Sequence, residues 1–310
     1  MSDFHRNLKK AELHLHLEGS ISPATIHEMH PHISIREVEN RYDHADFIGF
    51  LDAYKWIVQF LQTPEQYALA TRRVLETLER HNVRYVELTL SVGVILWKKQ
   101  DLAAIYTAVN REAKRSRIPC FWIFDFIRHF DLGHAMRVAE LAVERVNDGV
   151  VGFGLGGDES RGRAIDYVPA FELAKKAGLH LVPHAGETTN AQSVWDALKI
   201  GAERIGHGIR AVEDPELLAE LRRQNIPLEI CISSNVATGA VDTLPSHPIR
   251  RIAEAGVPIV LSTDDPAIFE TNISEEYAKA EQLGFSQAEL LELAANGFRY
   301  ALHPKFRTQE

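Results

Sequence analysis

Short runs of β-branched, aromatic and other apolar residues alternate along the chain with longer segments in which apolar residues recur every three or four positions. The short runs predict eight strands, at residues 11–16, 83–90, 119–127, 149–156, 179–186, 203–208, 227–234 and 257–264. The longer segments predict helices at 65–81, 101–115, 133–147, 167–177, 191–200, 214–224 and 246–255. Eight successive βα units predict an α/β fold, the (β/α)8 TIM-type barrel.

The segment between the first two predicted strands is too long for one loop and one helix. Residues 20–64 contain the polar stretch HEMHPHISIREVENRYDH and then a helical aromatic run at 47–61. Long insertions at the C-terminal face of a barrel build lids and pockets. We therefore expect a single domain over residues 1–310, with 20–64 as an insertion or lid over the active face. Its apolar wall is expected at Phe47, Phe50, Leu51, Tyr54 and Trp56, with ordinary helix packing as the alternative.

A doubly wound nucleotide-binding sheet is the competing α/β fold. The stretch GFGLGG at 152–157 matches the G-x-G-x-x-G pattern of dinucleotide-binding proteins. It follows the fourth predicted strand instead of the first, and DESRGR stands where a helix should begin. The pattern is therefore out of its structural context and predicts no nucleotide cofactor.

Composition excludes several classes of partner. The formal net charge is -9 over 310 residues, which argues against a nucleic acid or an anionic membrane surface as the main partner. No window approaches 18 uninterrupted apolar residues, and the first ten residues, MSDFHRNLKK, have no apolar signal core. Cys120 and Cys231 provide no disulfide framework. We expect a cytoplasmic protein with a small-molecule substrate; the sequence makes no prediction of its oligomeric state.

The stretch ELHLHLEG at 12–19 alternates histidine with leucine in the first predicted strand. Alternation places His14 and His16 on one face of the strand and the leucines on the other. In a barrel, the C-terminal ends of the strands meet at one face, where catalytic residues collect. The other predicted strand ends add further polar side chains: His184, Glu187, His207, Asp264 and Asp265.

Four of these residues have the chemistry of a metal site. His14, His16, His184 and Asp264 offer nitrogen and oxygen ligands to a divalent transition metal, zinc first, with one position left for water. One ion per chain is expected, because a second would need a bridging ligand such as a carbamylated lysine at the end of the fourth strand, and residues 149–162 contain no lysine. The zinc-deaminase pattern with C-x-x-C is absent from the sequence.

The remaining strand-end residues suit proton transfer. Zinc lowers the pKa of a bound water to about 7, which makes hydroxide available at neutral pH. Glu187 and His207 are then the expected proton-transfer groups, and Asp265 the carboxylate that orients the substrate.

With these residues assembled, the chain resembles the adenosine deaminase family of the amidohydrolase superfamily. Five stretches resemble the family's motifs, in the family's order and over nearly the whole chain: KAELHLHLEGSI (10–21), HAGE (184–187), RIGHGI (204–209), SSNVATGAV (233–241) and LSTDDPAIF (261–269). The resemblance implies hydrolytic replacement of the C6 amino group of a purine, giving ammonia and a 6-oxopurine.

The resemblance also implies a role for each site residue. His14, His16, His184 and Asp264 would bind zinc. Glu187 would protonate purine N1, and His207 would orient and deprotonate the attacking water. Asp265 would hydrogen-bond N7, and the backbone at Gly157 would reach N3.

Three departures from the family pattern lie on the sugar side of the pocket. Familiar adenosine deaminases have HLDG, with the aspartate near the ribose 5'-hydroxyl, where this chain has Glu18. The family's DLAGDE becomes GLGGDE, with Gly154 in place of an aspartate, and VRYSP becomes LTLSVG at 88–93. We therefore expect adenosine or a 5'-modified adenosine, such as aminodeoxyfutalosine, as the substrate, with Glu18 near its sugar.

Three alternatives stay open. An adenine deaminase acting on the free base is the closest, because glutamate in the place of Glu18 also occurs in relatives that deaminate free adenine or modified adenosines. A catalytically silent binding protein is disfavoured because every expected ligand and proton-transfer residue is present. A hydrolase of amide or phosphoester bonds on the same barrel is the last, and an obligatory second metal ion would favour it over deamination.

Overall fold

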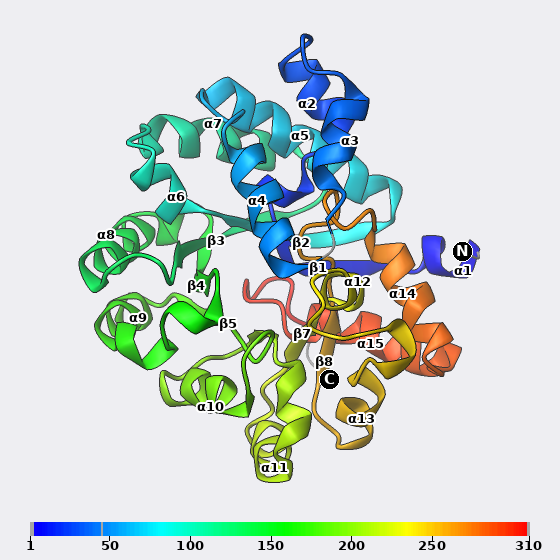
Figure 1. Ribbon diagram of the computed structural model, residues 1–310. Coiled ribbons are helices and arrows are strands. Elements are labelled where there is room, and N and C mark those ends of the chain that lie inside the picture. The colour runs from blue at the N-terminus through cyan, green and yellow to red at the C-terminus, as the bar shows by residue number, and fades with distance from the viewer. Residues whose placement is uncertain (1–2, 45, 309–310) are drawn as a thin grey trace.

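Eight parallel strands close into a barrel. The structure is a computed structural model that describes residues 3–44 and 46–308; residue 45 of the expected insertion and the ends of the expected domain lie outside them. Each strand pairs in parallel with its neighbour in sequence (Figure 1). A bridge between Leu15 and Asp264 joins the first strand to the last. The strands are β1 (Lys10–His16), β2 (Val83–Leu90), β3 (Cys120–Ile127), β4 (Val150–Gly156), β5 (His180–Ala185), β6 (Ile205–His207), β7 (Leu228–Ile230) and β8 (Ile259–Leu261). The predicted TIM-type barrel is confirmed.

Helices surround the strands as an outer ring (Figure 1). The ring contains α5 (Pro64–Arg80), α7 (Leu102–Arg115), α8 (Leu132–Val143), α9 (Val168–Lys176), α10 (Ala191–Lys199), α11 (Pro215–Gln224), α13 (Ile249–Glu254) and α15 (Gln287–Arg299). Further helices are α1 (Asp3–Asn7), α6 (Val92–Trp97), α12 (Ile232–Ala237) and α14 (Ile273–Gln282). Short 3-10 turns are η1 (Glu18–Ser20), η2 (Val146–Asp148), η3 (Glu159–Arg161), η4 (Ala164–Tyr167), η5 (Ile209–Glu213) and η6 (Leu244–Ser246). No helix of the described ranges has the length and apolarity needed to cross a bilayer.

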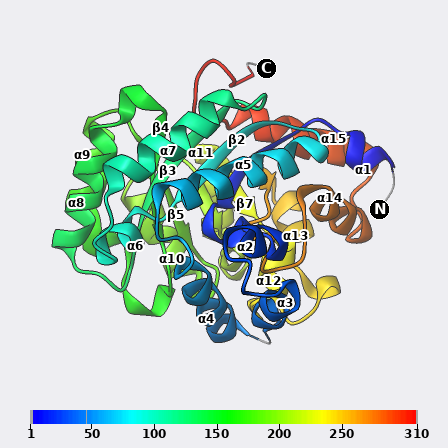
Figure 2. The same ribbon diagram turned by 90° about the horizontal axis from the view of Figure 1, so that it is seen from above.

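The insertion between β1 and β2 forms three helices at one end of the barrel: α2 (Pro23–Met29), α3 (Ile35–Tyr42) and α4 (Phe47–Val58). Figure 2 shows α3 and α4 at the end opposite the C-terminal segment. Ser22, Ser34 and Asp46 cap the three helices by accepting hydrogen bonds from backbone N–H groups of their first turns. Polar caps therefore fix where each inserted helix begins.

Several element boundaries differ from the sequence prediction. The strand predicted at 227–234 is wrong in its second half, because α12 begins at Ile232. The last pair between β7 and β8 joins Ile230 to Leu261, so the next residues have no strand partner on that side. The helix predicted at 133–147 ends at Val143, and the one predicted at 246–255 is shortened to α13, Ile249–Glu254. Helices α1, α2, α3, α6, α14 and α15 were not predicted.

Backbone hydrogen bonds connect the first and last strands at the C-terminal end of the barrel. Asp264 N–H donates to the His14 carbonyl at 3.0 Å, and His16 N–H donates to the Asp264 carbonyl at 2.9 Å. Deeper along the same seam, the buried Glu12 carboxylate accepts from the N–H and the hydroxyl of Thr263. The seam therefore places two residues of β1 beside the chain that leaves β8.

The start of α5 gives a prediction for stability. The Thr63 hydroxyl accepts from the Gln66 N–H, and the Gln66 side chain accepts from the Thr63 N–H, which forms a capping box. Thr63→Ala should lower the free energy of unfolding by about 1 kcal/mol, measured by urea denaturation. Thr77→Ala, at an exposed position of the same helix, should change it by less than about 0.5 kcal/mol. Equal losses in the two variants would contradict the capping role.

Candidate active site

The four residues predicted to bind metal come together at the C-terminal end of the barrel. His14 and His16 lie on β1, His184 lies near the end of β5, and Asp264 follows β8. The leucines that alternate with the two histidines of β1 are buried in the hydrophobic core. The alternation in ELHLHLEG therefore packs one face of the strand and directs the imidazoles of the other face into the barrel.

The donor atoms of these residues converge on one point. His16 Nε2 and His184 Nε2 lie 3.1 Å apart, and Asp264 Oδ1 lies 3.3 Å from Nε2 of both His14 and His16. Ligand atoms at about 2.0–2.1 Å from a tetrahedral zinc ion lie about 3.3–3.4 Å from one another. The observed spacing therefore fits one ion of that size.

Hydrogen bonds on the far side of two imidazoles orient their lone pairs. His14 Nδ1 lies 2.8 Å from the Glu229 carboxylate, and His184 Nδ1 lies 2.9 Å from the Leu155 carbonyl. Both oxygens are acceptors, so each Nδ1 carries the hydrogen and each Nε2 presents its lone pair to the cluster. His14 Nε2 is buried and has no hydrogen-bond partner. The chemistry of the site therefore fits a metal ion.

A buried arginine supports Glu229 from below. Arg204 is 1% exposed and pairs at 2.5 Å with both Glu229 and Glu87. Burial by itself raises the pKa of Glu229, but Arg204 and His14 outweigh it and hold the pKa below its usual value. Sequence reasoning missed Glu229 and Arg204; the available signal was a charged residue within a short apolar run.

Glu187 is held in place through its backbone. The carboxylate of Glu159 accepts hydrogen bonds from the four successive N–H groups of residues 186–189 and from the hydroxyls of Thr188 and Ser193. The Glu187 carboxylate lies 3.8 Å from His207 Nε2. Burial, with the nearby Asp264 carboxylate, raises the pKa of Glu187 well above its usual range, which favours the protonated form of the group.

A chain of hydrogen bonds fixes the hydrogen position on His207. The Ile249 N–H donates to His247 Nδ1, so a neutral His247 donates from Nε2 to the Asn235 carbonyl oxygen. The Asn235 amide then donates to His207 Nδ1, at 3.1 Å. A neutral His207 therefore carries its hydrogen on Nε2, the nitrogen that faces the cluster, which favours an orienting role over that of a base.

Two of these residues have unusual backbone conformations. His207 and Asp264 have φ angles of 60° and 66°, in the left-handed region that non-glycine residues seldom occupy. Such strain collects where the surrounding structure requires one side-chain direction. Here it directs both side chains toward the cluster.

Asp265 lies beside the cluster and explains why residue 19, the last of the ELHLHLEG stretch, is glycine. A Cβ at Gly19 would lie 1.7 Å from Asp265 Oδ1, so only glycine fits there. Burial, with the Asp264 carboxylate, raises the pKa of Asp265 well above its usual range. A protonated Asp265 can donate a hydrogen bond.

Three of the predicted metal ligands, His16, His184 and Asp264, line a cavity of about 670 Å³. Glu187, His207, Asp265 and Gly157 line it as well, and α4 and α6 form its apolar wall. Phe47, Phe50, Leu51 and Tyr54 of the expected wall line it. Trp56 does not; it packs edge-on against Phe60, with ring centroids 4.6 Å apart.

Glu18 is close to the cavity without lining it. Its carboxylate accepts from the Ser91 N–H at 3.1 Å and from the Tyr54 hydroxyl at 3.3 Å. Burial raises its pKa to about 7. The cavity wall at this place is formed by Tyr54 and Ser91, which lie between Glu18 and the space.

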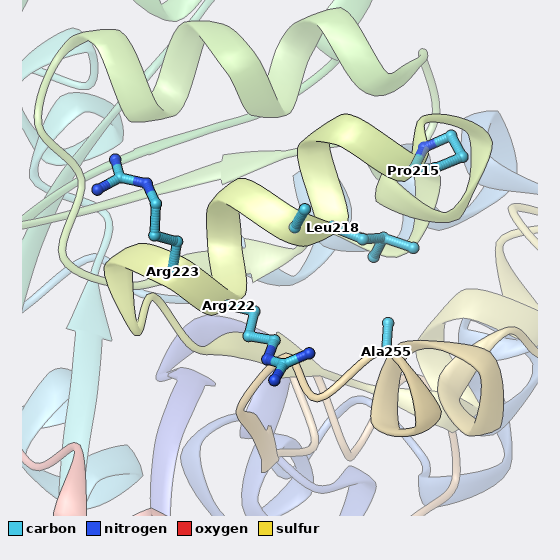
Figure 3. Close-up of a pocket in the computed structure, with 6 residues that line it drawn as sticks. Pro215, Leu218, Arg222, Arg223 and Ala255 are labelled. Carbon is cyan, nitrogen blue, oxygen red and sulfur yellow. The ribbon is translucent and has the colours of Figure 1, made fainter.

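A second pocket, of about 500 Å³, lies on the outside of the barrel between α11 and the end of α13 (Figure 3). Pro215, Leu218, Arg222 and Arg223 line it from α11, and Ala255 lines it from the other side. None of the residues predicted for the active site lines it. We assign no chemistry to this pocket.

The Glu229–His14 contact gives a prediction for metal affinity. Glu229→Gln should weaken metal binding about 10- to 100-fold, because the hydrogen bond that orients His14 loses its charge. Competition with a chromophoric chelator measures this, with circular dichroism to confirm the fold. Glu203→Gln is the matched control, because Glu203 makes the same 2.8 Å contact with Nδ1 of His180 away from the cluster. Equal effects in both variants, or none in either, would contradict the orienting role.

Comparison with known proteins places the chain in a family. The sequence model described as adenosine deaminase matches residues 9–310. An aminodeoxyfutalosine deaminase of Streptomyces coelicolor is 40% identical over 309 residues, covering 95% of this chain and 80% of the relative. The crystal structure of an adenine deaminase from Arthrobacter aurescens superposes with a TM-score of 0.90 at 28% identity, covering 97% of this chain and 95% of the other.

A third similar protein holds a metal. The crystal structure of an amidohydrolase from Burkholderia ambifaria, with bound Zn, superposes with a TM-score of 0.88 at 25% identity and covers 96% of this chain and 87% of the other. The chain thus belongs to the adenosine deaminase family of the amidohydrolase superfamily and is a hydrolase of the purine deaminase type.

Proposed function

We propose that the protein is a zinc-dependent deaminase of adenosine or of a 5'-modified adenosine nucleoside such as aminodeoxyfutalosine. The reaction replaces the C6 amino group by oxygen, releases ammonia and leaves a 6-oxopurine. The observation that carries the proposal is the cavity of about 670 Å³, which is lined by Glu187 and by three of the four predicted metal ligands, His16, His184 and Asp264.

One zinc ion per chain suits the residues that would hold it. His14, His16, His184 and Asp264 supply three imidazole nitrogens and a carboxylate oxygen, which are donor types that zinc binds, and a water would be the fifth ligand. When bound, zinc supplies a nucleophilic hydroxide at neutral pH. The zinc reported in the similar amidohydrolase supports the choice of metal.

Glu187 is the proposed proton donor to purine N1. Its raised pKa favours the protonated form, and protonation of N1 draws electrons from C6 and makes that carbon electrophilic. The hydrogen bonds that the backbone N–H groups of 186–189 donate to Glu159 hold the group at a fixed position. Preorganised placement of this kind lowers the barrier to reaction.

The other groups place the water and the purine. His207 donates from Nε2 to the oxygen of the attacking water and holds it beside C6. Asp265, whose protonated form is favoured by burial, donates to N7, and the backbone N–H at Gly157 donates to N3. Purine N1, N3 and N7 are all acceptors, so the three donors of the pocket match the edge of a 6-aminopurine.

The shape of the cavity supports a nucleoside over the free base. The apolar wall of α4 and α6 extends the cavity beyond the space that a purine ring needs, and Lys55 and Arg161 stand among its lining residues. This wall suits an apolar 5' substituent, and the cations suit a negative charge at its end. The similarity to the Streptomyces coelicolor enzyme supports the same choice.

An adenine deaminase is the second candidate. The structural similarity to the Arthrobacter aurescens adenine deaminase favours it, because the two chains superpose over nearly their full length. In that case the apolar wall would act as a lid and not as a substrate surface.

A substrate profile tests the proposal. The zinc-loaded protein should release ammonia from a 5'-modified adenosine or adenosine with a kcat/KM at least about 100-fold above that for adenine, because binding groups for the sugar would be left unpaired by the base. Activity on adenine alone would overturn the nucleoside assignment. A requirement for a second metal ion would favour hydrolysis of amide or phosphoester bonds instead.

The Glu187→Gln variant tests whether Glu187 donates the proton to the purine. It should keep its zinc and its fold while its kcat falls about 10²- to 10⁴-fold. Glu254→Gln, the same change at an exposed position of α13, should keep the wild-type rate. Full activity in Glu187→Gln would show that another group protonates the purine.

A further inference from the structure

Asp125 is a buried carboxylate of the cavity wall to which no role has yet been given. It lies near the end of β3, is 3% exposed, and lines the cavity that contains the metal cluster. Its Oδ1 atom has no hydrogen-bond partner. Leaving a buried polar atom unpaired is costly, so native proteins seldom do it without a functional reason.

The neighbouring acid on this side of the cavity is already engaged. Both oxygens of Glu18 accept hydrogen bonds, from the Ser91 N–H and the Tyr54 hydroxyl. The Tyr54 hydroxyl also lies 2.8 Å from the Ser91 hydroxyl. Of the two carboxylates, Asp125 is the one with an oxygen free to bind a substrate.

Glycines of β4 leave the space that the Asp125 side chain occupies. Asp125 is the register partner of Gly154 across the β3–β4 ladder. A Cβ at Gly154 would lie 3.3 Å from the Asp125 Cβ and 3.4 Å from the Val182 carbonyl, and a Cβ at Gly156 would lie 3.1 Å from Asp125 Oδ2. These contacts are tight, so larger residues at the two positions would press on the carboxyl.

The pairing with Gly154 also explains a departure in the sequence. In the motif stretch GLGGDE, Gly154 stands where the family pattern has an aspartate. This chain therefore has no aspartate at position 154 of β4. It has one on the adjacent strand β3, where Asp125 pairs with Gly154. The barrel keeps a carboxyl at this level of the wall but presents it from β3.

The position of Asp125 relative to the metal cluster indicates what it contacts. The reacting C6 of a purine must lie at the cluster, which is built from β1, β5 and the end of β8. N9, which carries the sugar, is on the opposite side of the purine ring system from C6. Ser91 and Asp125 lie at the ends of β2 and β3. They line the part of the cavity wall between Glu18 and Gly156.

We propose that Asp125 is a specificity-determining residue that hydrogen-bonds the 2'- or 3'-hydroxyl of the substrate's ribose. The inference rests on the proposed function and extends it, because it names the group by which the protein distinguishes a ribonucleoside from a free base. Sugar hydroxyls are donors and acceptors, and they would satisfy the oxygen that the protein leaves without a partner.

The ionisation of Asp125 is compatible with this contact. Burial, with the Glu18 carboxylate nearby, raises the pKa of Asp125 well above its usual range. A carboxyl group accepts a hydrogen bond at one oxygen in either protonation state and, when protonated, also donates one. Either form can therefore pair with a hydroxyl group.

The test compares four substrates in three proteins. Adenosine, 2'-deoxyadenosine, 3'-deoxyadenosine and adenine are assayed with the zinc-loaded wild type, Asp125→Asn and Asp125→Ala. In the wild type, one of the two deoxynucleosides should have a kcat/KM about 10- to 100-fold below that of adenosine. In Asp125→Ala, kcat/KM for adenosine should fall by the same factor and that discrimination should disappear. Asp125→Asn, which keeps an accepting oxygen, should lie between the two.

The controls separate this inference from the proposed function. In Asp125→Ala, kcat/KM for adenine and for the discriminated deoxynucleoside should stay within about twofold of the wild type, and the zinc content should be unchanged. Asp148→Asn, at an exposed surface position, should match the wild type on every substrate. Three results for Asp125→Ala would overturn the role of Asp125 and leave the proposed function intact. They are an equal loss of kcat/KM on all four substrates, unchanged discrimination between adenosine and the deoxynucleosides, and loss of zinc. A wild-type protein that is inactive on every adenosine nucleoside, the 5'-modified ones included, would overturn the proposed function and the inference together.

Discussion

The closure of the barrel between β1 and β8 is the constraint on which the site depends. Two backbone hydrogen bonds, between Asp264 and the chain at His14 and His16, align the last strand with the first. Because they run through the ligand residues themselves, the same contacts that close the barrel set the 3.3 Å spacing between the Asp264 carboxylate and both imidazoles. The left-handed backbone at Asp264 is the local strain that this arrangement requires.

Buried charges then hold the cluster from below. Arg204 connects Glu229, which orients His14, to Glu87 on β2. The Glu87 carboxylate in turn accepts from the Leu302 N–H, so the C-terminal segment belongs to the same network. Removing one partner of such a set leaves an unpaired charge in a dry environment, which costs more than the pair contributes. The predicted metal site is therefore supported by a buried network that reaches the C-terminal segment.

The sequence was sufficient for the parts that depend on periodicity and strand ends. Eight strands in order predict a barrel, and a barrel brings His14, His184 and Asp264 to one face whatever the length of the loops between them. Strand lengths were harder to predict from the sequence. The alternation in the apolar run at 227–234 continues after the pairing between β7 and β8 has ended, and α12 begins there instead.

The sequence analysis missed residues whose contacts depend on the register between neighbouring strands. Glu229 and Asp125 each lie inside an apolar strand, and which buried group they face depends on how neighbouring strands are offset. Asp125 faces Gly154 because of the β3–β4 register, which hydrophobic pattern does not fix. Glu159 was also missed, because its carboxylate binds backbone N–H groups and leaves no side-chain pattern to detect.

Anomalous diffraction at the zinc absorption edge, from crystals of the protein grown with zinc, tests the central claim most directly. The account predicts one peak per chain, about 2.0–2.2 Å from His14 Nε2, His16 Nε2, His184 Nε2 and Asp264 Oδ1. A peak elsewhere, a second ion in the cavity, or an ion that leaves one of these four atoms uncoordinated would contradict it.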